Sequence, residues 1–363
     1  MYPSSRMLHA LVALNLVALL TLAAPATCPA PKKIAQQAPQ ITQQPNQPVQ
    51  QVAKNSTQAE QGIQQIAQSS PQAQDLSGQD CCGYTITNRD NAWFRYRVVT
   101  DFASASLAEI TAQGWKVSHG WQAGAFNAKT GQSSIADRNN VKMIPSEGMA
   151  MIVPRQDKDA ASFTSAEVLF PSVTLGGIFE IEAKLSSVKG TCQGFFTFHA
   201  DGNKLGWHDE QDIEVLGVSL MAPATSPVPQ PAGMQLTNYD PATGVTSTLS
   251  SAFPVDPSKG YHTYSISWFP TTSSSNPAKN TEMRFDGKLL PSPKQYSATH
   301  ASNMIFNHWS NGDSGWSAGP PTEDATIYIK KVVAYYDKPA AVAEGSDVLK
   351  DTCDRAKACK VSV

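Results

Sequence analysis

The chain has 363 residues, of which 41% are hydrophobic and 16% are charged, and this fits one large globular domain with additional unstructured sequence. The formal net charge is -2, and the 28 lysine and arginine residues are scattered along the chain. A nucleic-acid partner is therefore not expected, because proteins of that class gather basic residues on one face. A neutral polymer or small molecule is the favoured substrate.

Residues 1–26 predict a secretory signal peptide. A short polar region is followed by an apolar run from Leu11 to Ala24, and the run ends in an Ala-Pro-Ala cleavage site. The run is shorter than the roughly 20 apolar residues that a membrane span needs, and no later stretch approaches that length. We expect a protein without a membrane anchor that is secreted and acts as a monomer, outside the cell or in the cell wall.

Residues 27–79 predict a disordered spacer. They are mainly Gln, Pro, Ala and Ser, with almost no aromatic or large aliphatic side chains, and cannot bury enough surface to offset the cost of ordering. The sequon Asn55-Ser56-Thr57 falls inside this spacer.

Residues 80–338 predict an all-β domain, because short β-branched and aromatic runs alternate there with Gly, Pro, Asn, Asp and Ser clusters. So many short strands indicate a sandwich of two antiparallel sheets or a jelly roll. Asp286-Gly287 is typical of a hairpin turn. A polar C-terminal tail covers residues 339–363. The candidate strands cover residues 94–101, 176–185, 194–200, 211–216, 261–269, 282–285 and 325–335.

The six cysteines of an exported chain are expected to be mostly paired. Cys353 and Cys359 are close enough to close a small loop in the tail. The adjacent Cys81 and Cys82 would bond to two different partners, with Cys192 as one candidate. No second Cys or His sits at ligand spacing beside these residues, so neither a metal nor another cofactor is predicted.

Three carboxylates occur at alternate positions within residues 207–217. On a strand, alternate residues point to one face, so Glu210, Asp212 and Glu214 should line one surface. The outer two Cα atoms would be ~13 Å apart, and side chains that lean towards each other would approach the ~5 Å carboxyl separation of a retaining glycosidase. One outer carboxylate would then be the nucleophile and the other the proton donor, with Asp212 holding their pKa values apart.

Two other interpretations of these carboxylates are a solvated acidic edge strand and a site for a hard cation such as calcium. Neither explains the flanking Trp207 and His208, or the apolar Ile213, Val215 and Leu216.

The run Glu210-Gln211-Asp212-Ile213-Glu214 resembles the active-site signature of family 16 glycoside hydrolases, which share a concanavalin-like β-jelly roll. The similarity spans roughly residues 81–337. Other segments that resemble strands of the family are residues 176–184, 194–198, 261–268 with 285–288, and 306–309.

This resemblance implies a role for each carboxylate: Glu210 as nucleophile, Glu214 as general acid/base and Asp212 as their helper. The positions that match sugar contacts of the family are Glu167, Asn238, Tyr239 and Trp309, and Trp207 and His208 are further candidates for substrate binding.

The chain also departs from the family. Gln211 stands where an aliphatic residue is usual, Leu169 where the lichenase branch has an Arg, and His208 where that branch has a Trp. The run His208-Asp209-Glu210 instead resembles plant xyloglucan-modifying members and some fungal cell-wall members.

We therefore expect a secreted retaining endo-β-glucanase that hydrolyses β-1,3 or β-1,3/1,4-glucan through a covalent glycosyl-enzyme. Two alternatives stay open. One is a cell-wall transglycosylase that acts on β-glucan with the same carboxylates. The other is a lectin-like carbohydrate-binding sandwich that lacks catalysis.

Overall fold

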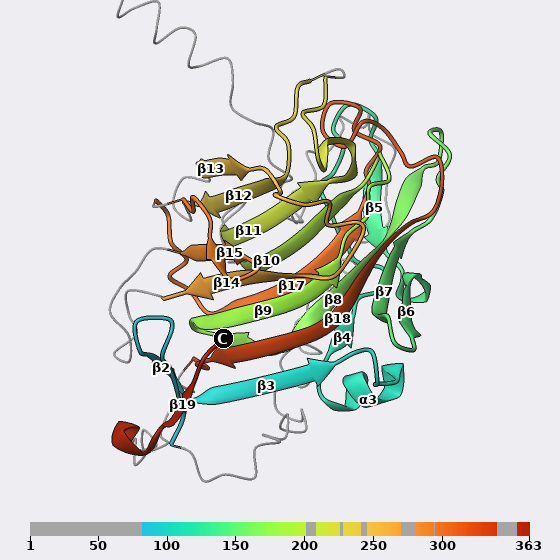
Figure 1. Cartoon of the computed structure of the whole chain (residues 1–363). Coiled ribbons are helices and arrows are strands. Elements are labelled where there is room, and N and C mark those ends of the chain that lie inside the picture. The colour runs from blue at the N-terminus through green and yellow to red at the C-terminus, as the bar shows by residue number, and fades with distance from the viewer. Residues whose placement is uncertain are drawn as a thin grey trace, which may run out of the picture.

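The computed structural model describes residues 82–200, 208–225, 228–240, 245–269, 281–293, 295–339 and 354–363. The predicted signal peptide and spacer lie outside them. Two sheets of eight strands each form the main body, and Figure 1 shows their long, curved strands. All strand pairs of these two sheets are antiparallel except that of β5 with β8. The predicted all-β sandwich of two antiparallel sheets is confirmed.

The first sheet, which we call the front sheet, carries the predicted carboxylates on one of its central strands. Its order is β13-β12-β11-β10-β17-β8-β4, and β5 pairs with β8. The strands are β4 (Lys116–Val117), β5 (Ser133–Ala136), β8 (Ser162–Thr174), β10 (Cys192–Ala200), β11 (His208–Leu216), β12 (Met234–Tyr239), β13 (Thr246–Ser251) and β17 (Ser302–Trp309).

The second sheet, the back sheet, covers one face of the front sheet. Its order is β16-β15-β14-β9-β18-β7-β6, and β3 pairs with β18. The strands are β3 (Tyr96–Asp101), β6 (Val141–Ile144), β7 (Gly148–Val153), β9 (Gly177–Lys184), β14 (His262–Trp268), β15 (Glu282–Phe285), β16 (Lys288–Leu289) and β18 (Ala325–Tyr336).

The main core lies between the two sheets. Alternate side chains of each strand point into it, as the two-residue period of a strand requires. Ile213 and Val215 of the front sheet belong to the same buried cluster as Ile181 and Ile266 of the back sheet. This places the side chains of Glu210, Asp212 and Glu214 on the other, outer face of the front sheet.

Short helices occupy the connections. The helix α3 (Leu107–Ala112) begins with a capping box in which Ser106 and Glu109 bond to each other's backbone N–H. The 3-10 turns are η1 (Arg138–Asn140), η2 (Gly217–Ser219) and η3 (Arg355–Lys357). None of the helices in the described ranges is both long enough and apolar enough to cross a membrane.

A third, three-stranded sheet packs on the outer face of the back sheet. It contains β1 (Tyr84–Ile86), β2 (Ala92–Phe94) and β19 (Cys359–Val361), and β19 runs parallel to β1. Its apolar side chains cluster with Ile178 and Tyr335 of the back sheet. Residues of the predicted C-terminal tail therefore form part of the folded domain.

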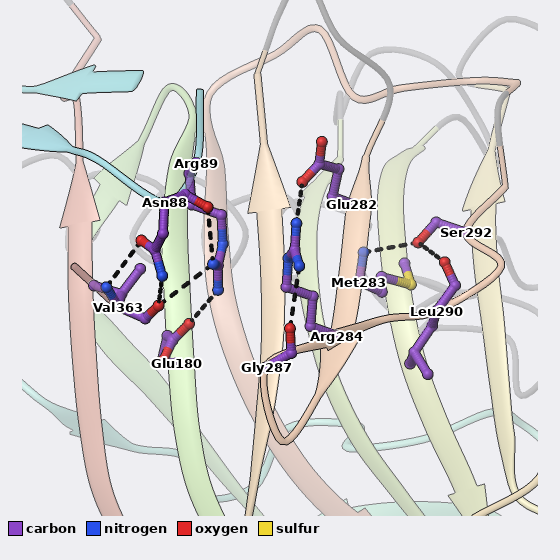
Figure 2. A network of polar contacts seen from close by, with 10 residues as sticks. All are labelled: Asn88, Arg89, Glu180, Glu282, Met283, Arg284, Gly287, Leu290, Ser292 and Val363. Carbon is purple, nitrogen blue, oxygen red and sulfur yellow. Dashed lines mark hydrogen bonds and ion pairs between the residues drawn. The ribbon is translucent and has the colours of Figure 1, made fainter. Parts of the chain in front are cut away.

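Figure 2 shows the polar contacts near this third sheet. Val363 N donates to Asn88 Oδ1 at 3.1 Å, so the chain beyond β19 is tied to the turn after β1. The next residue, Arg89, is buried and pairs with Glu180 of β9 at 2.9 Å. On β15, Arg284 contacts Glu282 at 3.3 Å. The outer face of the back sheet therefore holds charged groups that contact each other.

The structure bears on two predictions, the hairpin turn at Asp286-Gly287 and the pairing of the cysteines. The hairpin turn at Asp286-Gly287 is confirmed, because both residues have positive φ, 48° and 74°, and Phe285 pairs with Lys288 across the turn. Cys82 is a free thiol, so its predicted disulfide is wrong. The other predicted pairings involve Cys81 or Cys353, which lie outside the described residues, and they remain predictions.

Candidate active site

The central strand β11 brings the three predicted carboxylates to one face. It pairs with β10 on one side and β12 on the other, so that Asp212 lies between Phe196 and Thr237. Glu210 and Glu214 are its next neighbours on the same face, because side chains alternate along the strand. The predicted common surface for the three groups is therefore present.

The three carboxyl groups are nearly inaccessible to solvent. Glu210 and Asp212 each expose 1% of their surface and Glu214 exposes 6%. The Asp212 carboxyl is hydrogen-bonded to that of Glu210. Burial raises the pKa of Asp212 well above its usual value, and the negative charge of Glu210 and their shared hydrogen bond raise it further. Each of these effects favours the protonated form of Asp212.

Three side chains with rings, His208, Phe198 and Tyr239, lie close together at the Glu210 end of the site. His208 Nε2 lies 3.1 Å from Glu210 Oε2. The imidazole ring stacks on Phe198 with a centroid distance of 5.8 Å and contacts the ring of Tyr239 at 4.5 Å. His208 and Tyr239, both predicted as substrate-binding residues, thus lie beside the candidate nucleophile.

At the Glu214 end of the site, a glycine and two polar residues of neighbouring strands lie in line across the sheet. The strand register places Gly194, Asn307 and Glu167 in line with Glu214. Asn307 Nδ2 donates to the carbonyl of Ala123 at 2.9 Å. A Cβ atom on Gly194 would lie 2.5 Å from Asn307 Oδ1. Only glycine therefore leaves room between Glu214 and this amide.

Glu167, another predicted sugar contact, is a buried carboxyl at the far end of that row. Its Oε1 accepts a hydrogen bond from Ser118 Oγ at 2.7 Å. Burial raises the pKa of Glu167 to about 7, although the hydrogen bond from Ser118 acts in the opposite direction. Its Oε2 is buried and has no hydrogen-bond partner among the described residues.

The two halves of the outer face differ in chemistry. On the side of β10 and β17, Phe196 and Ile305 form a small apolar cluster with Leu169 and Phe198 against it. On the side of β12 and β13, the floor consists of polar groups. Thr237 and Thr248 share a hydrogen bond of 3.0 Å, and Ser250 donates to Gln235 at 2.7 Å. A chain that crosses the sheet would meet an apolar half and a hydroxyl-lined half.

The predicted sugar contact at Asn238 is not supported, because this side chain points to the inner face. It is fully buried, and its Nδ2 donates to the carbonyl of Gln295 at 3.0 Å. Neighbouring residues of a strand face opposite sides, so Asn238 and Tyr239 cannot both reach the outer face. Thr237 takes the position beside Asp212 instead.

The predicted stacking surface at Trp309 is covered in this structure. The ring exposes 2% of its surface and packs with Cys192, Leu216 and Trp316. A Cβ atom on Gly124 would come within 2.3 Å of the ring, so this loop lies directly on it. Trp309 is therefore a core residue at the edge of the site. Trp207, the remaining predicted residue, lies outside the described residues.

Gln211, the residue that departs from the family pattern, points into the space between the sheets. It accepts a hydrogen bond from the Thr281 hydroxyl and contacts Thr197 Oγ1 at 3.5 Å. These contacts provide hydrogen-bond partners for the buried Gln211 amide, which an aliphatic side chain at this position would not require.

Several residues in and around the site are not predicted by the sequence. Thr237 and the gap at Gly194 follow from the pairing of β11 with its neighbours, which no local pattern reveals. Asp209, on the inner face of β11, is given no role by the sequence pattern. Within the described ranges, no group of three or more His, Cys, Asp or Glu side chains is placed to hold a metal ion.

Comparisons with known proteins extend this picture. The sequence matches the model of glycosyl hydrolases family 16 over residues 124–319, more than half of the chain. No curated protein matches the sequence. Several solved structures share the fold, and two of them match over nearly their whole length. One, described as a native glycosidic hydrolase, is 19% identical, with a TM-score of 0.51 over 66% of this chain and 95% of the other. The second, a Bacillus licheniformis β-glucanase, is 20% identical, with a TM-score of 0.50 over 67% of this chain and 98% of the other. The predicted concanavalin-like jelly roll is confirmed.

Proposed function

Because the chain belongs to glycosyl hydrolase family 16, we propose that it is a retaining endo-β-glucanase acting on β-1,3 or β-1,3/1,4-glucan. The observation that carries the proposal is the common outer face of Glu210, Asp212 and Glu214 on β11, with Asp212 hydrogen-bonded to Glu210. A sugar-binding protein without catalysis has no need to bury three carboxyl groups side by side, because each of them costs free energy to desolvate.

In this mechanism, the Glu210 carboxylate attacks the anomeric carbon of the sugar. Glu214 gives its proton to the glycosidic oxygen as that bond breaks, and the product is a covalent glycosyl-enzyme and a free sugar hydroxyl. Glu214, now ionised, then removes a proton from water. The resulting hydroxide attacks the same carbon, and Glu210 leaves as a carboxylate. Both groups return to their starting states, and two displacements retain the anomeric configuration.

The electrostatics of Asp212 support these roles. The raised pKa favours the protonated form of Asp212, whose hydroxyl can donate to Glu210. That hydrogen bond favours the ionised form of Glu210, which a nucleophile requires. We propose that His208, 3.1 Å from Glu210 Oε2, orients this carboxylate rather than transferring protons itself.

For substrate binding, we propose that a neutral glucan chain crosses the outer face of the front sheet. Tyr239 lies beside Glu210, and Glu167 and Asn307 offer buried oxygen acceptors in line with Glu214. Sugar hydroxyls would supply the missing donors. The absence of a side chain at Gly194 leaves the Asn307 amide beside Glu214, where it would contact the sugar next to the proton donor.

The decisive experiment compares Glu210→Ala with Glu214→Ala. The first variant should lose all turnover, since no other group can form the glycosyl-enzyme. The second should retain more activity on an activated aryl glycoside, whose departure needs little protonation. Azide should rescue Glu214→Ala with a β-glycosyl azide and Glu210→Ala with the α-anomer. Inverted product from the wild type, or a fluoroglycoside label on another residue, would contradict the proposal.

A panel of laminarin, lichenan and xyloglucan tests the substrate. Release of reducing sugar from one of them identifies the linkage and excludes a lectin without activity. The transglycosylase alternative uses the same carboxylates, so it is separated by offering a labelled acceptor oligosaccharide. Labelled polymer among the products would assign transfer, and unlabelled oligosaccharides would assign hydrolysis.

We further propose that the protein is exported, loses residues 1–26, and works as a monomer outside the cell or in the cell wall. The apolar run before the Ala-Pro-Ala site supports export. A chain that begins at Gln79 should keep its activity on soluble glucan, because the spacer contributes no predicted site residue. N-terminal sequencing of the secreted protein checks the cleavage site, and failure of the shortened chain to fold would move the domain boundary.

A further inference from the structure

The candidate nucleophile lies very close to one end of its strand. β11 begins at His208, so Glu210 is its third residue. Hydrogen-bonded ladders open most readily at their ends. If Glu210 is to attack one defined atom, the start of β11 must be held in place by a further contact.

Asp209 makes such a contact. Its side chain points to the inner face and is fully buried. Its Oδ2 accepts hydrogen bonds from the backbone N–H groups of Thr299 at 2.7 Å and His300 at 3.0 Å. The imidazole Nδ1 of His300 lies 3.0 Å from the same oxygen, and the Thr299 hydroxyl lies at 3.3 Å.

These contacts join three neighbouring strands. Thr299 and His300 directly precede β17, and Asp209 belongs to β11, with β10 between them in the sheet. On β10, His199 pairs with Asp209, and its ring stacks on that of His300 at a centroid distance of 5.4 Å. We call Asp209, His199, Thr299 and His300 the strand-end clasp.

The segment held by Asp209 is itself fixed from other strands. Trp268 Nε1 on β14 donates to the carbonyl of Ala298 at 2.7 Å, and Asn238 Nδ2 on β12 donates to that of Gln295 at 3.0 Å. Asp209 thus bonds to a segment that is itself hydrogen-bonded to β14 and β12. Backbone N–H groups are also the donors best suited to an ionised carboxylate.

We propose that Asp209 is a positioning residue for the reaction: through the strand-end clasp it fixes the backbone of Glu210 and so the aim of the nucleophile. This inference rests on the proposed function. Asp209 itself does not touch the reacting atoms, because it lies on the opposite face of β11. Loss of the clasp should slow chemistry and leave substrate binding almost unchanged, since misplacement by about 1 Å can cost roughly 100-fold in rate.

The test uses Asp209→Ala, with Asp209→Asn as the conservative variant that keeps an acceptor oxygen. We expect Asp209→Ala to lower kcat by about 10- to 100-fold with KM within about twofold, and Asp209→Asn to recover much of the loss. The matched control is Asp256→Ala, which removes an aspartate that caps a loop through Ser258 N and Oγ outside the front sheet. Labelling of Glu210 by a fluoroglycoside should slow in parallel with kcat.

His300→Ala provides a second variant that should fold, because this side chain is 46% exposed. It should lower kcat in the same direction by a smaller factor. Hydrogen exchange of the amides of residues 208–211 gives a readout that needs no activity, and it should accelerate in Asp209→Ala. Wild-type protein without glucanase activity would refute the proposed function alone. The positioning role is refuted if Asp209→Ala matches Asp256→Ala in kcat, if KM rises instead, or if exchange at residues 208–211 is unchanged.

Discussion

The carboxyl group of Asp212 is hydrogen-bonded to that of Glu210, and both groups are almost completely buried. Burial and the charge of Glu210 raise the pKa of Asp212 well above its usual value. A group whose pKa is raised by folding stabilises the protein below its unfolded pKa of about 3.9 and destabilises it as the pH rises through the folded value. The wild type should therefore lose stability towards neutral and alkaline pH.

Asp212→Asn should remove this dependence and keep an N–H donor for Glu210. We expect its Tm to exceed that of the wild type at neutral and alkaline pH, with the difference vanishing towards pH 4. Thermal unfolding between pH 4 and 9 checks this. Asp212→Leu, which cannot donate, should lose much more kcat than Asp212→Asn. A Tm difference that grows towards acid pH would contradict the assignment of a protonated Asp212.

Gly194→Ala should damage activity more than stability. The new methyl group would meet Asn307 Oδ1 and force that side chain away from the carbonyl of Ala123, at a cost of about 1 kcal/mol for one hydrogen bond. It would also push the Asn307 amide out of the space beside Glu214, so kcat/KM on polymer should fall at least about tenfold. Gly260→Ala is the control, because the nearest atom to its added Cβ is at 4.0 Å. Equal kinetics for the two variants would show that this space is not used.

Trp309→Ala should mainly destabilise the fold, because the ring is 2% exposed and packed beneath Gly124. We expect a loss of about 3 to 5 kcal/mol in the free energy of unfolding, typical of a large aromatic side chain removed from a core. Trp121, 55% exposed, offers a matched control whose replacement by Ala should change stability by less than about 1 kcal/mol. Denaturant titration of both variants measures the difference. A stable Trp309→Ala protein with weakened glucan binding would restore the stacking role.

His308 should make the protein less stable in acid. It is a buried imidazole bonded to the carbonyl of Met151, and burial lowers its pKa to about 4. The unfolded chain binds this proton near pH 6.5 and the folded chain only near pH 4, so stability falls between these values by roughly 3 kcal/mol. His308→Gln should abolish this pH dependence of the free energy of unfolding, which unfolding curves measured at several pH values would show.

Glu167→Gln should remove a pH dependence of the opposite sign. The raised pKa of Glu167 lowers the stability of the wild type as the pH rises from about 4.5 through about 7.

The alternation rule accounts for what could be predicted of the site. Three carboxylates two residues apart must share a face of any strand, whatever the rest of the fold does. The Asp286-Gly287 hairpin is equally local, because its two positive φ values depend on residue types that tolerate them. Both features needed no knowledge of distant residues.

The features that sequence could not provide depend on distant contacts. β11 is buried on both faces, and its central place in the front sheet comes from its pairing with β10 and β12. The face of Asn238 depends on the pairing of β12 with β11, and the burial of Trp309 depends on a loop that lies over 180 residues earlier in the chain. β13, with the sequence Thr-Ser-Thr-Leu-Ser-Ser, lacks the apolar alternation typical of a strand and is held by pairing with β12.

The parallel pairing of β1 with β19 gives the domain a defined order of assembly. Asn88 and Val363, which bond across this sheet, are 275 positions apart. Closing so long a loop before the sheets exist would cost conformational entropy with few contacts in return. The small sheet should therefore form last and open first, as a separate cooperative unit of lower local stability. Its opening would expose Arg89 and Glu180 to water while the front sheet and its carboxylates stay folded.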